Sequence, residues 1–246
     1  MFEKLVKMQI MQTCGFFVSS YAAVNLGMFW LGMTLTGSRP IDPFAFAPSI
    51  VFLTISVLVW VKALHVLMTR SLCAPESTLM MTLPVSEEAL IGSKVFTATV
   101  GSFLVYVFLG GLLVYWTMMD VTMDVQLTSI AMQFIDLGYP AWIAGVSVGL
   151  VPLLVLIEQI TFAGLLLLVT LLLRNHHKLR KYTGPMFLVI VLLQMGFNIW
   201  LFINYEAFIG RVHPLALGLS LFAGFMGIAV LLYKLCVRQL KYNYMA

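Results

Sequence analysis

RSLCAPESTLMMTLPVSEEALIGSK, residues 70–94, separates two long apolar runs and is the most mixed in character of all segments of the chain. It has a basic residue at each end and acidic, apolar and proline residues between them. Glu76 or Ser77 is suited to cap a short helix, and Pro84 would end it. Two turns of helix are too short to be stable alone in water. The segment therefore predicts an amphipathic helix that needs a lipid or protein surface.

The composition places the runs on either side of this segment in a membrane. Of the 246 residues, 61% are hydrophobic and 10% are charged, whereas a soluble domain has about 25% charged residues. The net charge of +4 is small, and the basic residues are scattered among short loops, which excludes the basic patch of a nucleic-acid-binding protein. We predict an all-α, polytopic membrane protein with no nucleic-acid partner.

Six apolar runs are long enough to cross a hydrocarbon core of about 30 Å, which takes about 20 residues. They form a single transmembrane domain over residues 1–246. Ahead of the first run, residues 1–13 combine apolar side chains with Lys4 and Lys7, a pattern typical of an interfacial helix. The fourth run is too long for an upright span and is expected to tilt or to bend at Pro152. The predicted spans are 14–35, 44–68, 94–118, 142–173, 185–205 and 214–236, with a cytoplasmic coupling loop at 70–92.

The distribution of lysine and arginine predicts the orientation, because loops on the cytoplasmic side are rich in both. With the N-terminus inside, only Arg39 and Arg211 of the 14 basic residues fall on the outer side, which leaves 12 on the inner side. Six spans then return the C-terminus to the cytoplasm. We expect a multi-pass protein of the cell membrane, in contact with membrane lipid, with both termini cytoplasmic.

Three features occur together in the cytoplasmic loop: Glu76, the run LMMTLPVS at 79–86, and Lys94. This arrangement resembles the sequence after the second span of ABC-2 type transporter permeases, the membrane subunits of bacterial ABC exporters. That family has an acidic residue, a few apolar residues, TLPVS, and a basic residue that opens the third span. The likeness also extends to the number and spacing of the spans. The family usually has a basic residue soon after the serine, where this chain has Glu87 and Glu88.

The resemblance implies a transport subunit that docks on a separate ABC ATPase subunit through a coupling helix between spans two and three. Two permease chains, identical or different, would pair, and ATP and Mg²⁺ would be bound by the ATPase. Export is the implied direction. Walls rich in Leu, Met and Phe suit an amphipathic peptide, an antimicrobial or a lipid-like cargo. The docking residues that the resemblance implies are Glu76, Ser77, Leu79, Met80, Leu83, Pro84 and Val85.

The chain carries no motif for nucleotide binding or catalysis. The patterns G-x-x-x-x-G-K-[ST] and H-E-x-x-H are absent from the sequence. The run G-V-S-V-G at 145–149 lies inside the predicted fourth span, not at the strand-to-helix turn that a catalytic serine of the G-x-S-x-G type needs. His176 and His177 are adjacent and lack the spacing and companions of a metal site. We expect a transport subunit that is not an enzyme and that binds no cofactor or metal of its own.

Glu158 is the acidic residue that lies deep in a predicted span. A charge at the bilayer centre costs on the order of 3 kcal/mol, so Glu158 should face protein or water, or be protonated. Gln194 and Asn198, one turn apart in the fifth span, are candidate partners, and Asn25 in the first span is a further polar candidate. These residues are interpreted as a translocation pathway or as polar pairs. Proton coupling, a pathway role and a structural pair all remain open for Glu158.

Two other functions fit the same composition. A secondary transporter or channel coupled through Glu158 would move its cargo without any ATPase. A membrane sensor or assembly factor would show no dependence on cargo. A neighbouring reading frame that encodes a P-loop ATPase would favour the ABC subunit over both.

Overall fold

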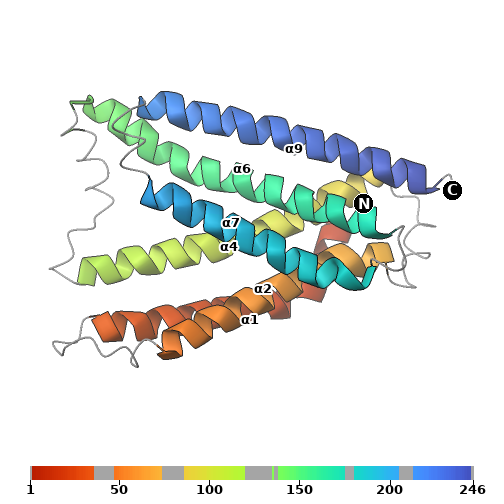
Figure 1. Ribbon diagram of the computed structural model, residues 1–246, viewed down its shortest axis with the longest axis horizontal. Coiled ribbons are helices and arrows are strands. Elements are labelled where there is room, and N and C mark those ends of the chain that lie inside the picture. The colour runs from red at the N-terminus through yellow and green to blue at the C-terminus, as the bar shows by residue number, and fades with distance from the viewer. Residues whose placement is uncertain are drawn as a thin grey trace.

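The computed structural model describes residues 2–35, 47–73, 86–119, 135, 138–174, 180–204 and 213–244 of the chain. Almost all of these residues are helical, and the helices lie side by side in an elongated bundle with both termini toward one end (Figure 1). The elements, in chain order, are α1 (Phe2–Leu35), α2 (Ala47–Cys73), α4 (Glu87–Met119), α6 (Ala141–Arg174), the short 3-10 helix η2 (Arg180–Tyr182), α7 (Thr183–Ile203) and α9 (Pro214–Tyr244).

Four helices in the described part of the chain are long and apolar enough to cross a membrane: α2, α4, α6 and α9. Helix α7 has a shorter apolar stretch, Thr183–Asn198. The all-α class is therefore confirmed, and the helices are compatible with a multi-pass membrane protein. Six spans remain a prediction.

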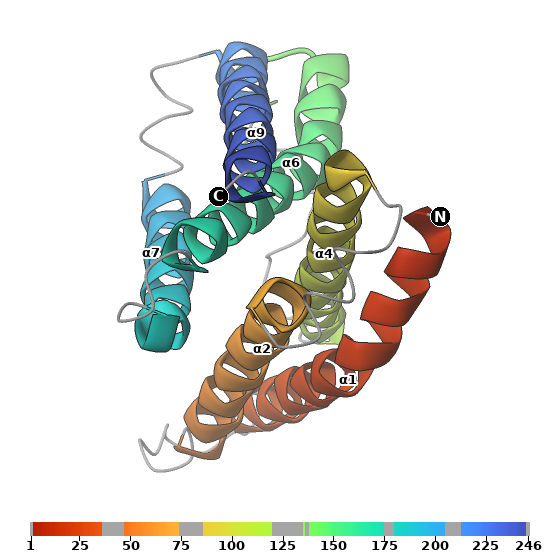
Figure 2. The ribbon, with the colours of Figure 1, turned by 90° about the vertical axis from the view of Figure 1, so that its right-hand side faces the viewer.

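The N-terminal segment is part of a longer helix. Helix α1 runs without a break from Phe2 to Leu35, so residues 1–13 and the predicted first span form one element. Figure 2 shows that α1 bends, so that its first turns lie beside α4. The ring of Phe2 packs edge-on against Phe96 of α4, with the ring centroids 6.1 Å apart.

The third helix begins earlier than predicted. The sequence predicts a start at Lys94, whereas α4 begins at Glu87, and α2 continues to Cys73. The coupling loop predicted at 70–92 is thus helical at both of its ends. Ser86 explains the early start, because its Oγ accepts a hydrogen bond from Ala89 N at 3.3 Å and caps the helix. The two glutamates in the first turn further stabilise the positive end of the helix dipole.

Helix α6 changes direction along its length, as Figure 2 shows. It contains Pro152, which lacks the backbone N–H of a helical residue and crowds the carbonyl one turn earlier. The bend expected in the fourth run is therefore present, and the helix nonetheless continues from Ala141 to Arg174.

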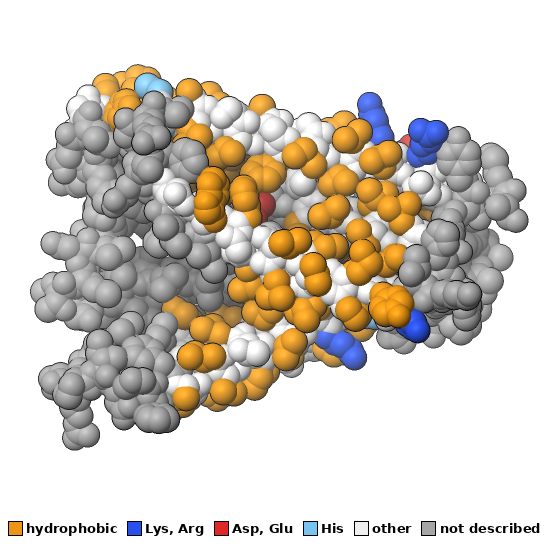
Figure 3. Space-filling model, viewed as in Figure 1, with side chains coloured by type: hydrophobic (Ala, Val, Ile, Leu, Met, Phe, Trp, Pro, Cys, Tyr) orange, Lys and Arg blue, Asp and Glu red, His pale blue; other side chains and the backbone are white. Residues whose placement is uncertain are grey.

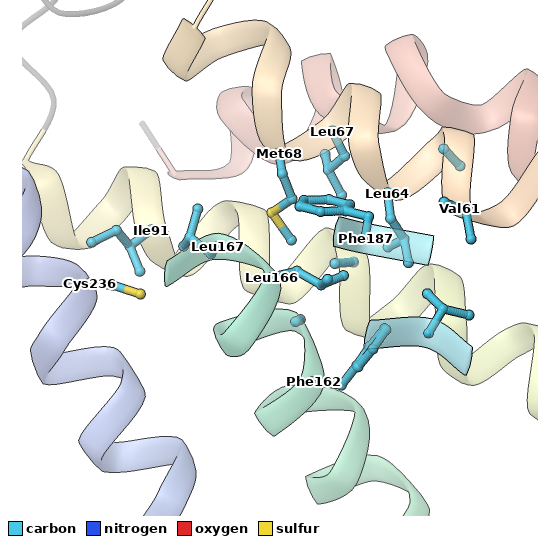
Figure 4. Close-up of a cluster of buried hydrophobic side chains, with 14 of the residues drawn as sticks. Val61, Leu64, Leu67, Met68, Ile91, Phe162, Leu166, Leu167, Phe187 and Cys236 are labelled. Carbon is cyan, nitrogen blue, oxygen red and sulfur yellow. The ribbon is translucent and has the colours of Figure 1, made fainter. Parts of the chain in front are cut away.

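The buried hydrophobic core lies in the half of the bundle where α2 ends and α4 begins. Figure 4 shows the ring of Phe187 among side chains of α2 and α6, whereas Cys236 of α9 lies further along the cluster, beside Ile91 of α4. In the opposite half, apolar side chains such as Ile50, Trp142 and Leu219 are exposed. The core side chains labelled in Figure 4 are Val61, Leu64, Leu67, Met68, Ile91, Phe162, Leu166, Leu167, Phe187 and Cys236.

A buried polar node fixes the first turns of α1 against α4. Gln9 is buried, its Nε2 donates to Ser93 Oγ at 3.0 Å, and its Oε1 accepts from Thr97 Oγ1 at 3.2 Å. Both polar ends of one amide are thus satisfied by a neighbouring helix. This pairing sets the position of α1 along α4, because a shift of one turn would leave the amide without these partners.

We expect Gln9→Leu to lower the free energy of unfolding by about 1–2 kcal/mol, since two buried hydrogen bonds are lost while the volume is nearly kept. The measurement is a denaturant titration of the purified protein in detergent. Gln12→Leu is the matched control, because Gln12 is one turn away, half-buried and outside this node. Equal losses for the two variants would contradict the assignment.

Candidate functional site

The seven predicted docking residues all fall between residues 76 and 85, outside the described part of the chain. The structure describes the two helices that flank them, α2 up to Cys73 and α4 from Glu87. Both flanks lie toward the end of the bundle that holds the two termini (Figure 1).

Lys94 joins these two flanking helices. Its side chain is fully buried, with 0% exposed. The ammonium group donates to the backbone carbonyl of Leu67 and, at 3.4 Å, to that of Met68, both near the end of α2. A cation is stabilised near the negative end of a helix, where carbonyl oxygens and the helix dipole point toward it. The two helices are therefore held together close to the ends that flank the predicted docking segment.

The polar residues predicted in spans four and five do meet. Gln194 Nε2 of α7 donates to Glu158 Oε1 of α6 at 3.0 Å. Both residues lie near the middle of their helices, 17 and 16 residues from the ends of α6 for Glu158, and 11 and 9 from the ends of α7 for Gln194. At 1.5 Å per residue, Glu158 is about 25 Å from either end of α6. A structural pair is thus part of the role of Glu158.

Asn198 and Asn25 are not brought into this pair. Asn198 is half-buried, and the described hydrogen bond of Glu158 comes from Gln194 rather than from Asn198. Asn25 Nδ2 donates to the carbonyl of Tyr21 at 2.7 Å, one turn earlier in its own helix. Asn25 therefore satisfies its amide locally, as side chains of this kind commonly do.

Two buried glutamines, Gln194 of the pair and Gln159 next to Glu158 in the sequence, have polar atoms without a hydrogen-bond partner among the described residues. Gln194 Oε1 has no partner, and neither Oε1 nor Nε2 of Gln159 has one. Gln159 is only 1% exposed. A buried polar atom without a partner costs about 1–3 kcal/mol, so this part of α6 and α7 is less stable than an apolar interface would be.

Sequence reasoning missed the burial of Lys94 and the cap at Ser86. The signal for the cap was present, since a serine followed by Glu87 and Glu88 is typical of a helix start. The burial of Lys94 carried no such signal. A lysine at the start of an apolar run is equally consistent with a side chain that extends to the interface.

Among the residues that the structure describes, no group of three or more His, Cys, Asp or Glu side chains is placed to hold a metal ion. No family model matches the chain, and no curated protein or solved structure matches it either. The functional argument therefore depends on the residues themselves.

Proposed function

We propose that this chain is the transmembrane subunit of an ATP-driven exporter of the ABC-2 permease type. It docks a separate ATPase through the 70–92 loop and moves an amphipathic peptide, an antimicrobial or a lipid-like molecule outward. The observation that carries the proposal is the TLPVS-containing segment between α2 and α4. The two helix ends that flank this segment, Cys73 of α2 and Glu87 of α4, lie toward the end of the bundle with both termini (Figure 1). The exposed basic residues gather toward the same end, which supports a cytoplasmic location (Figure 3).

The contact of Lys94 with α2 supports a mechanism for the coupling. A force on the docking segment acts on the end of α2 and the start of α4, and Lys94 bonds these two helix ends to one another. The helices then move together rather than separately, as packed elements do in domain closure. ATP-driven closure of the ATPase would in this way tilt α2 and α4.

The exposed apolar surface supports the pairing of two permease chains in lipid. Leu219 and Leu231 of α9 are each 57% exposed, and a Cβ added at Gly145 or Gly149 of α6 would meet nothing within 4 Å. Surfaces of this kind are covered either by lipid or by another helix, and small residues allow close helix approach. In the proposed complex each of the two chains rests on one ATPase subunit, which binds ATP and Mg²⁺.

The proposal is tested by co-expression with the ATPase and by the variant Leu83→Asp. We expect the amount of co-purified ATPase to fall by roughly tenfold or more, because a charge replaces an apolar anchor in the docking segment. Cargo-stimulated ATP hydrolysis should be lost in parallel. Ile135→Asp is the matched control, since Ile135 is an exposed apolar residue far from the segment in sequence. Assembly and coupling that survive Leu83→Asp would overturn the docking assignment.

A second candidate function is secondary transport coupled through Glu158. The observation in its favour is the Glu158–Gln194 hydrogen bond at mid-length of α6 and α7, since acidic groups at this depth are typical of proton relays. This function predicts transport by the chain alone in proteoliposomes and its loss in Glu158→Gln. The ABC proposal predicts no transport by the chain without its ATPase.

A further inference from the structure

Gln194, the hydrogen-bond partner of Glu158, is a neutral amide, so it does not balance the negative charge of an ionised carboxylate. We call these two residues the α6–α7 polar site. Among the described residues no lysine, arginine or histidine forms an ion pair with Glu158, and the Gln194 amide is the donor to its Oε1. Figure 3 shows the basic side chains gathered toward one end, whereas the face at mid-length of the bundle is mainly hydrophobic.

The α6–α7 polar site has more acceptors than donors. An ionised carboxylate only accepts hydrogen bonds, and an amide has one acceptor oxygen beside its NH₂ group. One Gln194 N–H is used on Glu158 Oε1, while Gln194 Oε1 is buried and has no partner among the described residues. A ligand that donates hydrogen bonds and carries positive charge would therefore fit this site, and an anion would be repelled.

Glu158 is partly accessible, whereas Gln194 is 9% exposed. The Gln194 amide holds one carboxylate oxygen, and because the Glu158 side chain is partly accessible, its other oxygen is available to a ligand. Gln194 is in this sense a positioning residue. Charge-assisted hydrogen bonds to a carboxylate are about twice as strong as neutral ones, and low-dielectric surroundings strengthen them further.

The surroundings of the polar site are apolar and exposed. Val151 and Leu165 are two helical turns before and after Glu158 on α6, and Phe197 is one turn after Gln194 on α7. All three side chains are exposed. A residue two turns away lies on the same face of a helix at about 10 Å along its axis, so exposed apolar side chains lie along this face before and after the carboxylate. A ligand for this site would need a long apolar part as well as its cationic group.

We propose that the α6–α7 polar site binds the protonated amine of an amphiphilic molecule, with Glu158 as the counter-ion and the apolar border in contact with the alkyl part. The inference rests on the proposed function, because it names the chemical class of the cargo as cationic amphiphiles. It also gives Glu158 a reason to lie at mid-length, where a charge without a partner is costly.

The test measures binding to the full chain alone, in nanodiscs of neutral phosphatidylcholine, with tritiated dodecylamine as the probe and empty nanodiscs as background. We expect saturable binding of dodecylamine and binding of dodecanol that is weaker by roughly tenfold or more, since the alcohol lacks the charge. This comparison needs no variant, so it decides the question even if a variant fails to fold.

Glu158→Gln should weaken dodecylamine binding by roughly tenfold or more and leave dodecanol binding unchanged. Glu88→Gln is the matched control, because it removes one carboxylate from an exposed position in the first turn of α4. We expect binding within about twofold of the parent protein for this control. Equal binding of amine and alcohol, or equal binding by the parent protein and Glu158→Gln, would overturn the proposal.

The assay contains no ATPase, so its outcome is separate from that of the docking experiment. If the chain binds the amine but does not assemble with an ATPase, the polar-site proposal stands and the exporter proposal fails. If the chain assembles with its ATPase but binds amine and alcohol equally, the exporter proposal stands and the polar-site proposal fails.

Discussion

Lys94→Ala is expected to lower the free energy of unfolding by about 3–5 kcal/mol. The substitution removes a fully buried side chain and leaves a cavity of several methylene groups between α2 and α4. It also removes the charge-assisted hydrogen bonds to the carbonyls of Leu67 and Met68. The removal of a buried charge offsets part of this loss, but the ammonium is already stabilised by carbonyl groups and by the end of the α2 dipole. The measurement is a denaturant titration in detergent.

Two further variants separate the contributions of volume and of hydrogen bonding. Lys94→Met keeps most of the volume, so it should lower the free energy of unfolding by less than Lys94→Ala does. Lys62→Ala is the matched control, because Lys62 is an exposed lysine of α2, and its effect should stay within about 0.5 kcal/mol. If Lys94→Ala costs no more than Lys62→Ala, Lys94 does not hold the two helices together.

Gly101→Ala is expected to lower the free energy of unfolding by about 1–3 kcal/mol, although alanine is the better helix former. A Cβ at this position would lie 2.5 to 2.8 Å from three ring carbons of Phe17. The ring is buried between α1 and α4 and has little room to move. The same contact carries a hydrogen bond from Tyr21 Oη to the carbonyl of Gly101 at 2.8 Å, so a displaced α1 would lose this bond as well.

Gly15→Ala is the control for this substitution. A Cβ at Gly15 would meet nothing within 4 Å, so helix propensity alone should raise the stability by up to about 1 kcal/mol. Phe17→Leu combined with Gly101→Ala should restore part of the loss, with a coupling energy of at least about 1 kcal/mol. Strictly additive effects in this double-mutant cycle would show that Phe17 and Gly101 are not in contact.

The apolar runs predicted most of the fold, because a membrane-compatible chain must form helices of a known minimum length. The predicted run 142–173 and the observed helix Ala141–Arg174 agree within one residue at each end. The start of α4 was predicted too late, since hydropathy does not detect a capped, acidic first turn. The sequence divided α1 into an interfacial helix and a span, because polar residues interrupt the apolar pattern of its first turns, and one of them, Gln9, bonds to α4.

The candidate site was predicted in part. A single acidic residue in a span requires a partner, and the sequence offered Gln194, which the structure pairs with Glu158. Asn198, one turn from Gln194, was equally plausible as the partner from the sequence. The sequence could not distinguish them, because a helix that is apolar all round gives little signal of which face meets which neighbour. The burial of Gln159 and Lys94 was unpredictable for the same reason. The docking residues lie outside the described part of the chain, so their role remains a proposal.

The placement of the buried core at one end of the bundle has a mechanical consequence. Six helices contribute side chains to this buried cluster, which lies close to the end of α2 and the start of α4 that flank the predicted docking segment. The far ends of these helices expose their apolar side chains. A small rotation about this fixed region displaces the far ends by more than the near ends, as the tip of a rod moves further than a point beside its pivot. The end of the bundle away from the termini would thus amplify a displacement of a few ångströms that originates at the end that holds them.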